Sequence, residues 1–264
     1  MTCTAPLLVD QRGDVRWLLL NRPDRRNALD EQLTAALEEQ VEDIEHDDRT
    51  SVVVVAGEGP SFCAGGDFRH FLSLADGDRV VGFLSRLSAC LARVEASPKP
   101  WVGALHGHAI AGGLELALVC DVVIAAEGTR IGDGHVNNHL LPGAGSAVRL
   151  ERAIGKGNAR WMHLSGESLS AEELMPTGWI RELVPAAALR DRAQALAAQL
   201  ASRHFGTQQN MKRLLGEVWN LEQDDALARE LNAFEANWTE SDVPSALHGF
   251  LARRSGRSYE GQRS

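Results

Sequence analysis

The chain has 264 residues, of which 44% are hydrophobic and 24% charged, an ordinary composition for a globular protein with a sizeable core. Its formal net charge of −9 argues against nucleic acid as the main partner, because basic surfaces bind phosphate groups. No apolar run approaches the ~18 residues of a membrane-spanning helix, and the opening MTCTAPLLVDQRGD lacks the basic and apolar regions of a signal peptide, so we expect a cytoplasmic protein without membrane contact.

Strand-like and helix-like segments alternate along the first two-thirds of the chain. The apolar run VRWLLL, stopped by Pro23, predicts a buried strand, and the β-branched run SVVVV at 51–55 predicts a second one. Between them, residues 29–47 carry apolar side chains at helical spacing, with Asp30 placed as the N-cap. We then expect a helix at 79–96, a strand at 100–107, a helix at 114–120 and a strand at 121–127. This order predicts an α/β fold with a largely parallel sheet.

The last third of the chain has a different pattern. From about residue 186 it looks purely helical, with amphipathic segments at 187–203, 207–220 and 224–238. The Ser/Gly/Arg-rich stretch RRSGRSYEGQRS at 253–264 predicts a mobile tail. We therefore predict an α/β catalytic core at 1–185 and a helical C-terminal region at 186–264.

Several familiar motifs are incomplete. GEGPSF lacks the third glycine of a dinucleotide fingerprint, AIGKGNAR lacks the first glycine and the Ser/Thr of a P-loop, and no G-x-S-x-G elbow occurs. The cysteines are widely spaced without a C-x-x-C pair, which favours reduced thiols over disulfides or a zinc site. They are Cys3, Cys63, Cys90 and Cys120.

The loop GDGHVNNHLLPGAGS at 132–146 is unusually polar. Asp133, His135 and His139 could be read as metal ligands, but no acidic or histidine partner lies at helical spacing. We interpret them as polar loop residues and predict no metal.

Two glycine turns suggest chemistry. SFCAGGDF and HGHAIAGGLELAL each follow a predicted buried strand, and glycine lets backbone N–H groups approach a ligand closely. The second turn leads into a helix, whose first amides favour negative charge. Two such amides converging on one carbonyl oxygen would form an oxyanion hole.

These turns belong to a larger resemblance. The segments LNRPDRRNALD, SFCAGGDF, HGHAIAGGLELALVCDVVIAAE and LPGAGSAVRLERAIGKGNARWMHLSGESLSAEEL resemble, in order and spacing, the crotonase superfamily of enoyl-CoA hydratases and isomerases, over residues 7–185. The resemblance implies a spiral of repeated ββα units followed by a helical trimerisation region. It also implies a coenzyme A thioester as substrate, no separate cofactor, and a homotrimer or a dimer of trimers.

The same resemblance assigns binding residues. The oxyanion-hole amides would be those of Gly66 and Gly112. The loop that holds the adenine and phosphate end of coenzyme A would contain Arg25, Arg26 and Ala28, and guanidinium groups pair well with phosphate. Ala64 and Asp67, on either side of the first glycine turn, complete the set implied to contact coenzyme A.

Two proton-transfer residues are also implied. Hydratases of this family carry one glutamate after the second glycine turn, and Glu115 matches it. A carboxylate at the start of an otherwise apolar helix is costly to bury, which favours a functional role. The second family glutamate precedes a Pro-Gly turn by seven residues, and counting back from Pro142 gives His135. Imidazole can deliver a proton to carbon but has one acceptor nitrogen for water, so His135 is a departure with chemical consequences.

Three functions remain open. The leading hypothesis is an acyl-CoA enzyme that stabilises a thioester enolate and hydrates, dehydrates or isomerises an enoyl-CoA through Glu115 and His135. The first alternative is carbon–carbon cleavage of a β-dicarbonyl compound, since some superfamily hydrolases carry a histidine near this loop after an element like Asp133-Gly134. The second is a catalytically silent coenzyme A-binding or scaffold protein.

Overall fold

The structure is a computed structural model that describes residues 5–74 and 76–260, with side chains described up to Arg253. The contacts divide the chain into two compact units, Met1–Ser202 and Arg203–Ser264. This border follows helix α8 (Leu189–Ala201), whereas our sequence-based border at 185/186 precedes it. The difference arises because α8 packs on the sheet of the first unit.

A six-stranded sheet forms the centre of the first unit. Its strand order is β1-β2-β3-β4-β6-β9; β1 and β2 pair in antiparallel fashion and all other neighbours are parallel. The strands are β1 (Leu7–Arg12), β2 (Val15–Leu20), β3 (Val52–Gly57), β4 (Trp101–Leu105), β6 (Val122–Ala126) and β9 (Ile180–Val184). Every residue of β2, β3 and β4 is buried, as expected for parallel strands covered on both faces.

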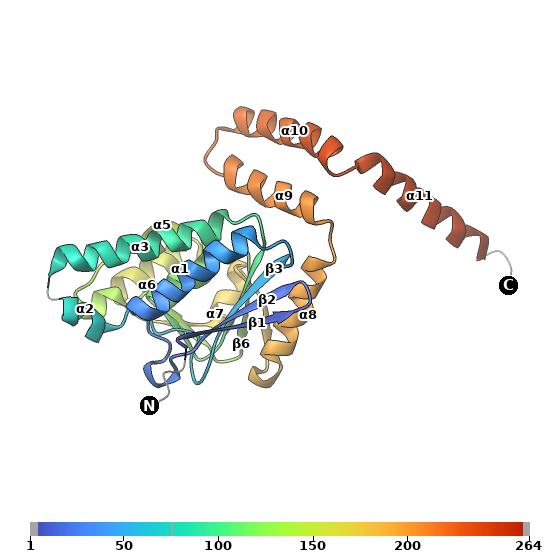
Figure 1. Cartoon of the computed structure of the whole chain (residues 1–264). Coiled ribbons are helices and arrows are strands. Elements are labelled where there is room, and N and C mark those ends of the chain that lie inside the picture. Colours follow the sequence, from blue (N-terminus) through green and yellow to red (C-terminus); the bar gives the residue numbers. More distant parts are fainter. Residues whose placement is uncertain (1–4, 75, 261–264) are drawn as a thin grey trace. The chain divides into compact units, whose positions relative to one another are not determined.

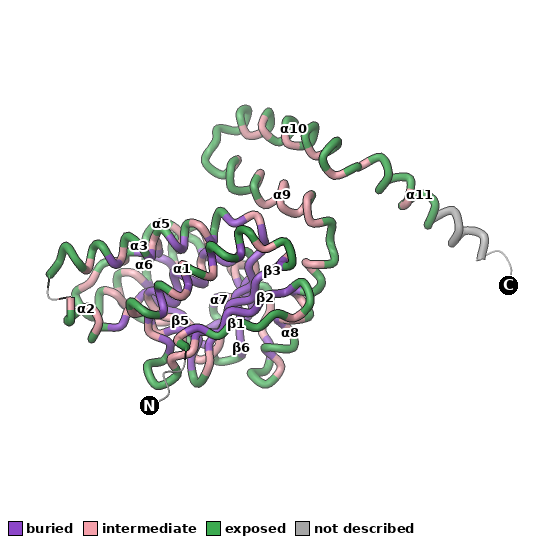
Figure 2. Tube along the Cα trace, in the orientation of Figure 1, coloured by how far each residue is buried: buried purple, intermediate pink, exposed green. Residues whose placement is uncertain are grey.

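Two apolar layers sandwich this sheet. Helices α1 (Glu31–His46) and α3 (Gly77–Ala96) contribute to the layer on one face, which includes the fully buried Trp101. Helix α8 covers the other face, where Trp17 donates from Nε1 to Gln194 Oε1 at 2.6 Å. Figure 1 shows these helices against the strands, and Figure 2 shows the buried strands between them.

A smaller sheet carries the loops of interest. It pairs β5 (His108–Ile110) with β7 (Arg130–Gly132) in parallel and β7 with β8 (Leu169–Ser170) in antiparallel fashion. These strands have only two or three residues each. The remaining helices of the first unit are α2 (Phe68–Leu74), α4 (Gly112–Leu118), α5 (Ser146–Ile154), α6 (Lys156–Ser165) and α7 (Ala171–Leu174), with 3₁₀ turns η1 (Pro23–Arg25), η2 (His135–Asn138), η3 (Met175–Thr177) and η4 (Ala186–Ala188).

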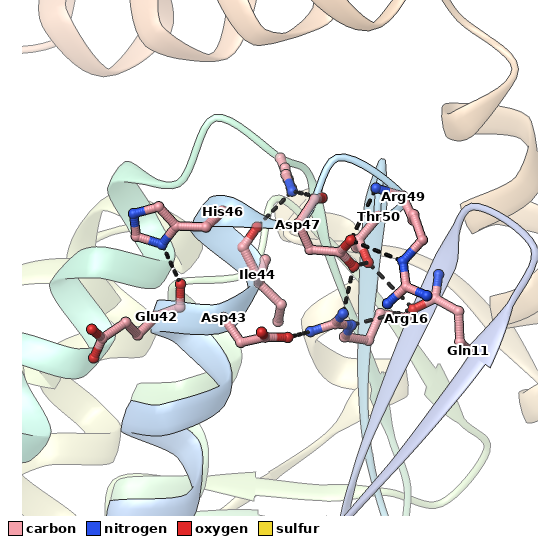
Figure 3. A network of polar contacts seen from close by, with 10 residues as sticks. Gln11, Arg16, Glu42, Asp43, Ile44, His46, Asp47, Arg49 and Thr50 are labelled. Carbon is pink, nitrogen blue, oxygen red and sulfur yellow. Dashed lines mark hydrogen bonds and ion pairs between the residues drawn. The ribbon is translucent and has the colours of Figure 1, made fainter.

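A buried polar network secures the C-terminal end of α1. Lys99 donates from Nζ to the carbonyl oxygens of Ile44 and Asp47 at 2.5 and 2.6 Å, in addition to the backbone N–H groups of Asp47 and Thr50, which donate to the same oxygens at 3.4 and 3.2 Å. The guanidinium of Arg16 on β2 lies between Asp43 and Asp47 (Figure 3). The network therefore ties the end of α1 to the sheet.

The second unit consists of helices α9 (Phe205–Val218), α10 (Gln223–Glu240) and α11 (Val243–Glu260). Asn210 on α9 donates to Asn237 and Glu240 on α10. Apolar side chains remain exposed on all three helices: Met211, Leu215, Trp219, Leu227, Leu231, Phe234, Trp238, Leu247, Phe250 and Leu251.

The predicted mixed α/β fold with a helical C-terminal region is confirmed, and Asp30 caps α1 by accepting from Leu33 N at 3.0 Å. The segment predicted as a mobile tail, 253–264, is helical up to Glu260, and residues 261–264 lie outside the described residues. Within the described ranges, no helix is both long and apolar enough to cross a membrane.

Candidate active site

A cavity of about 210 Å³ in the first unit brings together five residues singled out from the sequence: Ala64, Gly66, Gly112, Glu115 and His135. One wall is apolar and comes mainly from α2, α3 and the loop after η2. Its side chains are Phe68, Phe71, Val80, Phe83, Leu84, Leu87, Leu140 and Leu141. The cavity therefore combines a polar end with an apolar compartment.

Backbone hydrogen bonds join the two glycine turns into one assembly. Phe62 N–H donates to His106 C=O at 2.8 Å and Cys63 N–H donates to His108 C=O at 3.0 Å. In return, Ile110 N–H donates to Cys63 C=O at 3.0 Å. The segments that lead to Gly66 and Gly112 are thus paired like short strands, and their relative position is fixed before any ligand binds.

The N–H of Gly66 is directed away from its own pairing partner. Leu29 forms a parallel bridge with Gly66, in which Leu29 N–H donates to Gly65 C=O and Asp67 N–H donates to Leu29 C=O, at 2.7 and 2.8 Å. Successive N–H groups of an extended segment point to opposite sides, so the Gly66 N–H does not take part in this bridge. Gly66 itself lines the cavity.

Ala111 sets the direction of the Gly112 N–H. It has φ 49° and ψ −116°, a strained conformation for a residue with a Cβ. Two hydrogen bonds of 2.9 Å hold it there: its N–H donates to Gly132 C=O and its C=O accepts from Glu115 N–H. Gly112 then begins α4, where first-turn N–H groups have no partner inside the helix.

Glu115 is 2% exposed and has one oxygen engaged. Its Oε1 accepts from Ala144 N–H at 2.8 Å and from Ser146 N–H at 3.1 Å, at the start of α5. A helix N-terminus favours negative charge, so these amides satisfy the buried carboxylate and fix its orientation. Glu115 also lines the cavity.

His135 has an acidic partner that sequence reasoning did not assign to it. Its Nδ1 lies 3.1 Å from Asp133 Oδ1, and Asp133 is 1% exposed. The contact is an ion pair whose N–H is poorly aligned for a hydrogen bond. Because Nδ1 faces Asp133, Nε2 is the ring nitrogen left for a ligand. The Ser146 hydroxyl donates to the same Asp133 oxygen, so this carboxylate is also held by α5.

The other oxygen of Asp133 faces a second histidine. His163 on α6 places Nδ1 3.2 Å from Asp133 Oδ2. The two imidazoles thus approach different oxygens, and the side chains described here contain no cluster of three or more His, Cys, Asp or Glu that could hold a metal ion. His139, the other candidate ligand, is exposed at the end of η2.

The pKa values of this pair shift in the directions that an ion pair requires. Burial alone would raise the pKa of Asp133, but the contacts with His135 and Ser146 and the nearby His163 lower it to about 2. Burial alone would lower the pKa of His135, but the carboxylates of Asp133 and, further away, Glu115 raise it above its usual value. His135 therefore holds its proton more tightly than an ordinary histidine does.

The predicted coenzyme A loop is rigid in its backbone and exposed in its side chains. Arg25 and Arg26 are exposed, and Arg26 and Asn27 have positive φ values of 48° and 57°. The Asn27 side chain is fully buried and donates to the carbonyls of Glu58, Ser61 and Phe62. Asn27 therefore anchors the loop to the first glycine turn, while the side chains of Arg25 and Arg26 are exposed.

Arg22 links this loop to the cavity. Its Nη2 lies 2.6 Å from Asp30 Oδ2 and 3.0 Å from Asp67 Oδ2, and its Nη1 donates to Ala28 C=O. Ala64, which lines the cavity, donates from N–H to Arg26 C=O at 2.9 Å. The Asp67 carboxylate is thus engaged within the chain, and its predicted contact with coenzyme A stays a prediction, as do those of Arg25, Arg26, Ala28 and Ala64.

Three of the four cysteines are buried free thiols: Cys63, Cys90 and Cys120. Burial raises the pKa of Cys63, beside the first glycine turn, to about 12, so this thiol stays protonated and unreactive at neutral pH. Cys3 lies outside the described residues.

Sequence reasoning missed Asn27, Arg22 and His163. Asn27 and Arg22 stand inside the quoted segment LNRPDRRNALD, but each follows another polar residue there, so the local pattern does not single them out. His163 lies on a separate helix from Asp133, and no spacing rule links the two positions.

The fold and the cavity define the class of this protein, an enzyme of the crotonase type, and solved structures of enoyl-CoA hydratases share its architecture. The enoyl-CoA hydratase of Bacillus anthracis superposes with a TM-score of 0.89 at 29% identity, over 94% of this chain and 96% of that one. The enoyl-CoA hydratase of Mycobacterium smegmatis gives 0.90 at 26% identity, over 94% and 96% of the two chains.

The sequence comparisons identify the family. A family model described as enoyl-CoA hydratase/isomerase matches residues 11–261, and the chain belongs to this family. It is 33% identical over 248 residues to the 2,3-dehydroadipyl-CoA hydratase of Escherichia coli K12, covering 94% of this chain and 96% of the relative. It is 28% identical over 251 residues to the short-chain-enoyl-CoA hydratase of Clostridium acetobutylicum, covering 94% and 95%.

Proposed function

We propose that the protein adds water to an enoyl-CoA thioester, or moves its double bond, through an enolate held by the amides of Gly66 and Gly112. The observation that supports this proposal is that Gly66, Gly112, Glu115 and His135 line one cavity. Coenzyme A enters as the carrier of the substrate. The apolar wall formed by Phe71, Phe83 and Leu87 suits the hydrocarbon part of an acyl group.

In hydration, Glu115 acts as the base. Its free Oε2 takes a proton from a water molecule while the water oxygen bonds to Cβ of the enoyl group. The electron pair of the Cα–Cβ double bond moves toward the thioester, and the carbonyl oxygen gains negative charge. The Gly66 and Gly112 amides stabilise that oxygen, and the loss of one such donor typically costs about 3 kcal/mol.

His135 completes the reaction as the acid. The protonated imidazole donates from Nε2 to Cα, so the elements of water are added across the double bond and His135 becomes neutral. The raised pKa of His135 supports this role, because it keeps the donor form populated near neutral pH. In isomerisation the same two residues would remove a proton from one carbon and return it to another.

A second candidate is hydrolytic cleavage of a β-dicarbonyl compound. The buried Asp133 beside His135 Nδ1 favours it, because an Asp–His pair is also an arrangement that activates water. The exposed arginines of the predicted coenzyme A loop favour the thioester substrate instead.

A mass-spectrometric screen of enoyl-, 3-hydroxyacyl- and 3-oxoacyl-CoA thioesters in D₂O separates these functions. Hydration adds the mass of water with a deuteron at Cα, isomerisation adds no water, and cleavage gives two fragments. Loss of turnover in both Glu115→Gln and His135→Gln, with unchanged coenzyme A binding, is the expected result. Binding of acyl-CoA without turnover of any thioester by the wild type would contradict the proposal and indicate a scaffold.

A further inference from the structure

Asp133 contacts two imidazoles on opposite sides of one carboxylate. His135 Nδ1 lies 3.1 Å from Oδ1 and His163 Nδ1 lies 3.2 Å from Oδ2. The exposed fractions of the side chains are 11% for His135, 2% for Asp133 and 23% for His163. His135 lines the cavity and His163 does not, so His163 can influence the chemistry only through Asp133.

A carboxylate that is contacted on both sides has little freedom to turn away from either partner. Asp133 is buried, and Ser146 and His163 limit the positions that its carboxylate can take beside His135.

We propose that His163 is a positioning residue for the proposed proton donor: it contacts the far side of the Asp133 carboxylate and so holds that carboxylate against His135. This inference rests on the proposed function for its catalytic meaning. Its physical content, the contact between Asp133 and His135, can be measured without substrate.

The surroundings of His135 contain few other charges. Asp133 lies beside Nδ1, Glu115 approaches from α4, and Asp133 in turn faces His163 from α6. From α5 the Ser146 hydroxyl donates to Asp133. Helices α2 and α3 present apolar side chains to the cavity, among them Phe71 and Phe83. The charged groups that raise the pKa of His135 are therefore the carboxylates of Asp133 and Glu115.

The test uses two variants of His163. His163→Asn keeps an N–H donor near the position of Nδ1 but cannot take up a proton, whereas His163→Leu removes the donor as well. His46→Asn, at an exposed histidine on α1, is the matched control. Imidazole NMR signals of the free enzyme are titrated, and kcat is measured across pH on the thioester that the screen identifies.

In His163→Asn we expect kcat and the titration midpoint of His135 to stay near those of the wild type, because the amide still offers a donor to Asp133. His163→Leu should lose about tenfold in kcat, since Asp133 is no longer held on its far side. In His163→Leu the midpoint of His135 should also move to lower pH, because its carboxylate partner is held less firmly. His46→Asn should change nothing.

The inference is overturned if His163→Leu keeps both the kcat and the His135 titration midpoint of the wild type, or if His163→Asn loses as much as His163→Leu. Failure of the proposed function has a different signature. In that case His135→Gln retains full turnover, whatever the titration curve of His135 shows.

Discussion

Glu115, the proposed base, is held in place through one of its two carboxylate oxygens. In Glu115→Gln the side-chain oxygen can still accept from Ala144 and Ser146, so we expect the fold and the affinity for coenzyme A to persist. Turnover should fall by about 10²–10⁴, because the amide cannot act as a base. Steady-state kinetics and calorimetric titration with coenzyme A check this. Weakened coenzyme A binding with unchanged kcat would contradict the assigned role.

Ala111 stores backbone strain beside the proposed oxyanion hole, with φ 49° and ψ −116°. Ala111→Gly should relieve strain that is worth about 1–3 kcal/mol, less the ~0.5–1 kcal/mol entropy cost of glycine. We expect unfolding to require about 1 kcal/mol more free energy, and kcat to fall because the Gly112 N–H is held less firmly. Denaturant unfolding and kinetics measure both effects. A stability loss would show that Ala111 is not strained.

The ion pair of Asp133 and His135 predicts that its contribution to folding stability is lost at both high and low pH. The raised pKa of His135 means that its contribution to stability is complete below the unfolded value near ~6.5 and is lost as pH rises through the folded value. The lowered pKa of Asp133 means that its contribution is present above ~3.9 and is lost as pH falls toward about 2.

The value of kcat should follow the protonation of His135, because the proposed acid must carry a proton. We expect kcat to decline on the alkaline side with a midpoint above that of an ordinary histidine, and Asp133→Asn to move this midpoint to lower pH. A pH–rate profile of both proteins tests it. If Asp133→Asn shows the same alkaline midpoint as the wild type, the decline in kcat does not come from deprotonation of His135.

At the scale of elements, the buried Lys99 is the donor that closes the C-terminal end of α1. Lys99→Met keeps most of the side-chain volume but leaves the carbonyls of Ile44 and Asp47 without this donor. We expect a loss of about 2–3 kcal/mol in the free energy of unfolding, measured with denaturant. Lys156→Met, at an exposed lysine that begins α6, is the control and should change stability little. If both substitutions change the free energy of unfolding equally, the hydrogen bonds of Lys99 do not contribute to stability as expected.

The longer elements could be predicted because their own residues decide them. The run of buried valines in β3 and the capped, periodic helix α1 have strong local signals. Strands β5, β7 and β8 have two or three residues, and only their hydrogen-bond partners make them strands. The packing of α8 on the sheet likewise depends on tertiary contacts, because the sequence of an amphipathic helix does not specify which surface it packs against.

The candidate site was predictable in part for the same reason. The glycine turns and Glu115 stand in contiguous motifs, so the resemblance could assign them. The pairing of His135 with Asp133 joins near neighbours and was within reach. The contact of Asp133 with His163 depends on how α6 packs against η2, which no local pattern encodes.

At the scale of the whole molecule, the second unit exposes more apolar surface than a solitary domain normally does. Leu231, Phe234 and Trp238 on α10 are 68%, 59% and 41% exposed. We propose that these residues are covered in a homotrimer or a dimer of trimers. Sedimentation at micromolar concentration should show such an assembly, and Leu231→Asp should weaken it. A monomeric wild type would contradict the proposal.

The distribution of indole rings gives the protein an intrinsic optical signal. Trp17 and Trp101 are fully buried on opposite faces of the central sheet, whereas Trp219 and Trp238 on the second unit are exposed. Indole emission moves to shorter wavelength in apolar surroundings, so loss of the core shifts it to the red and association of the second unit shifts it to the blue. Only association depends on protein concentration. A dilution series and a denaturation series of the unlabelled protein can therefore distinguish dissociation of the assembly from melting of its core.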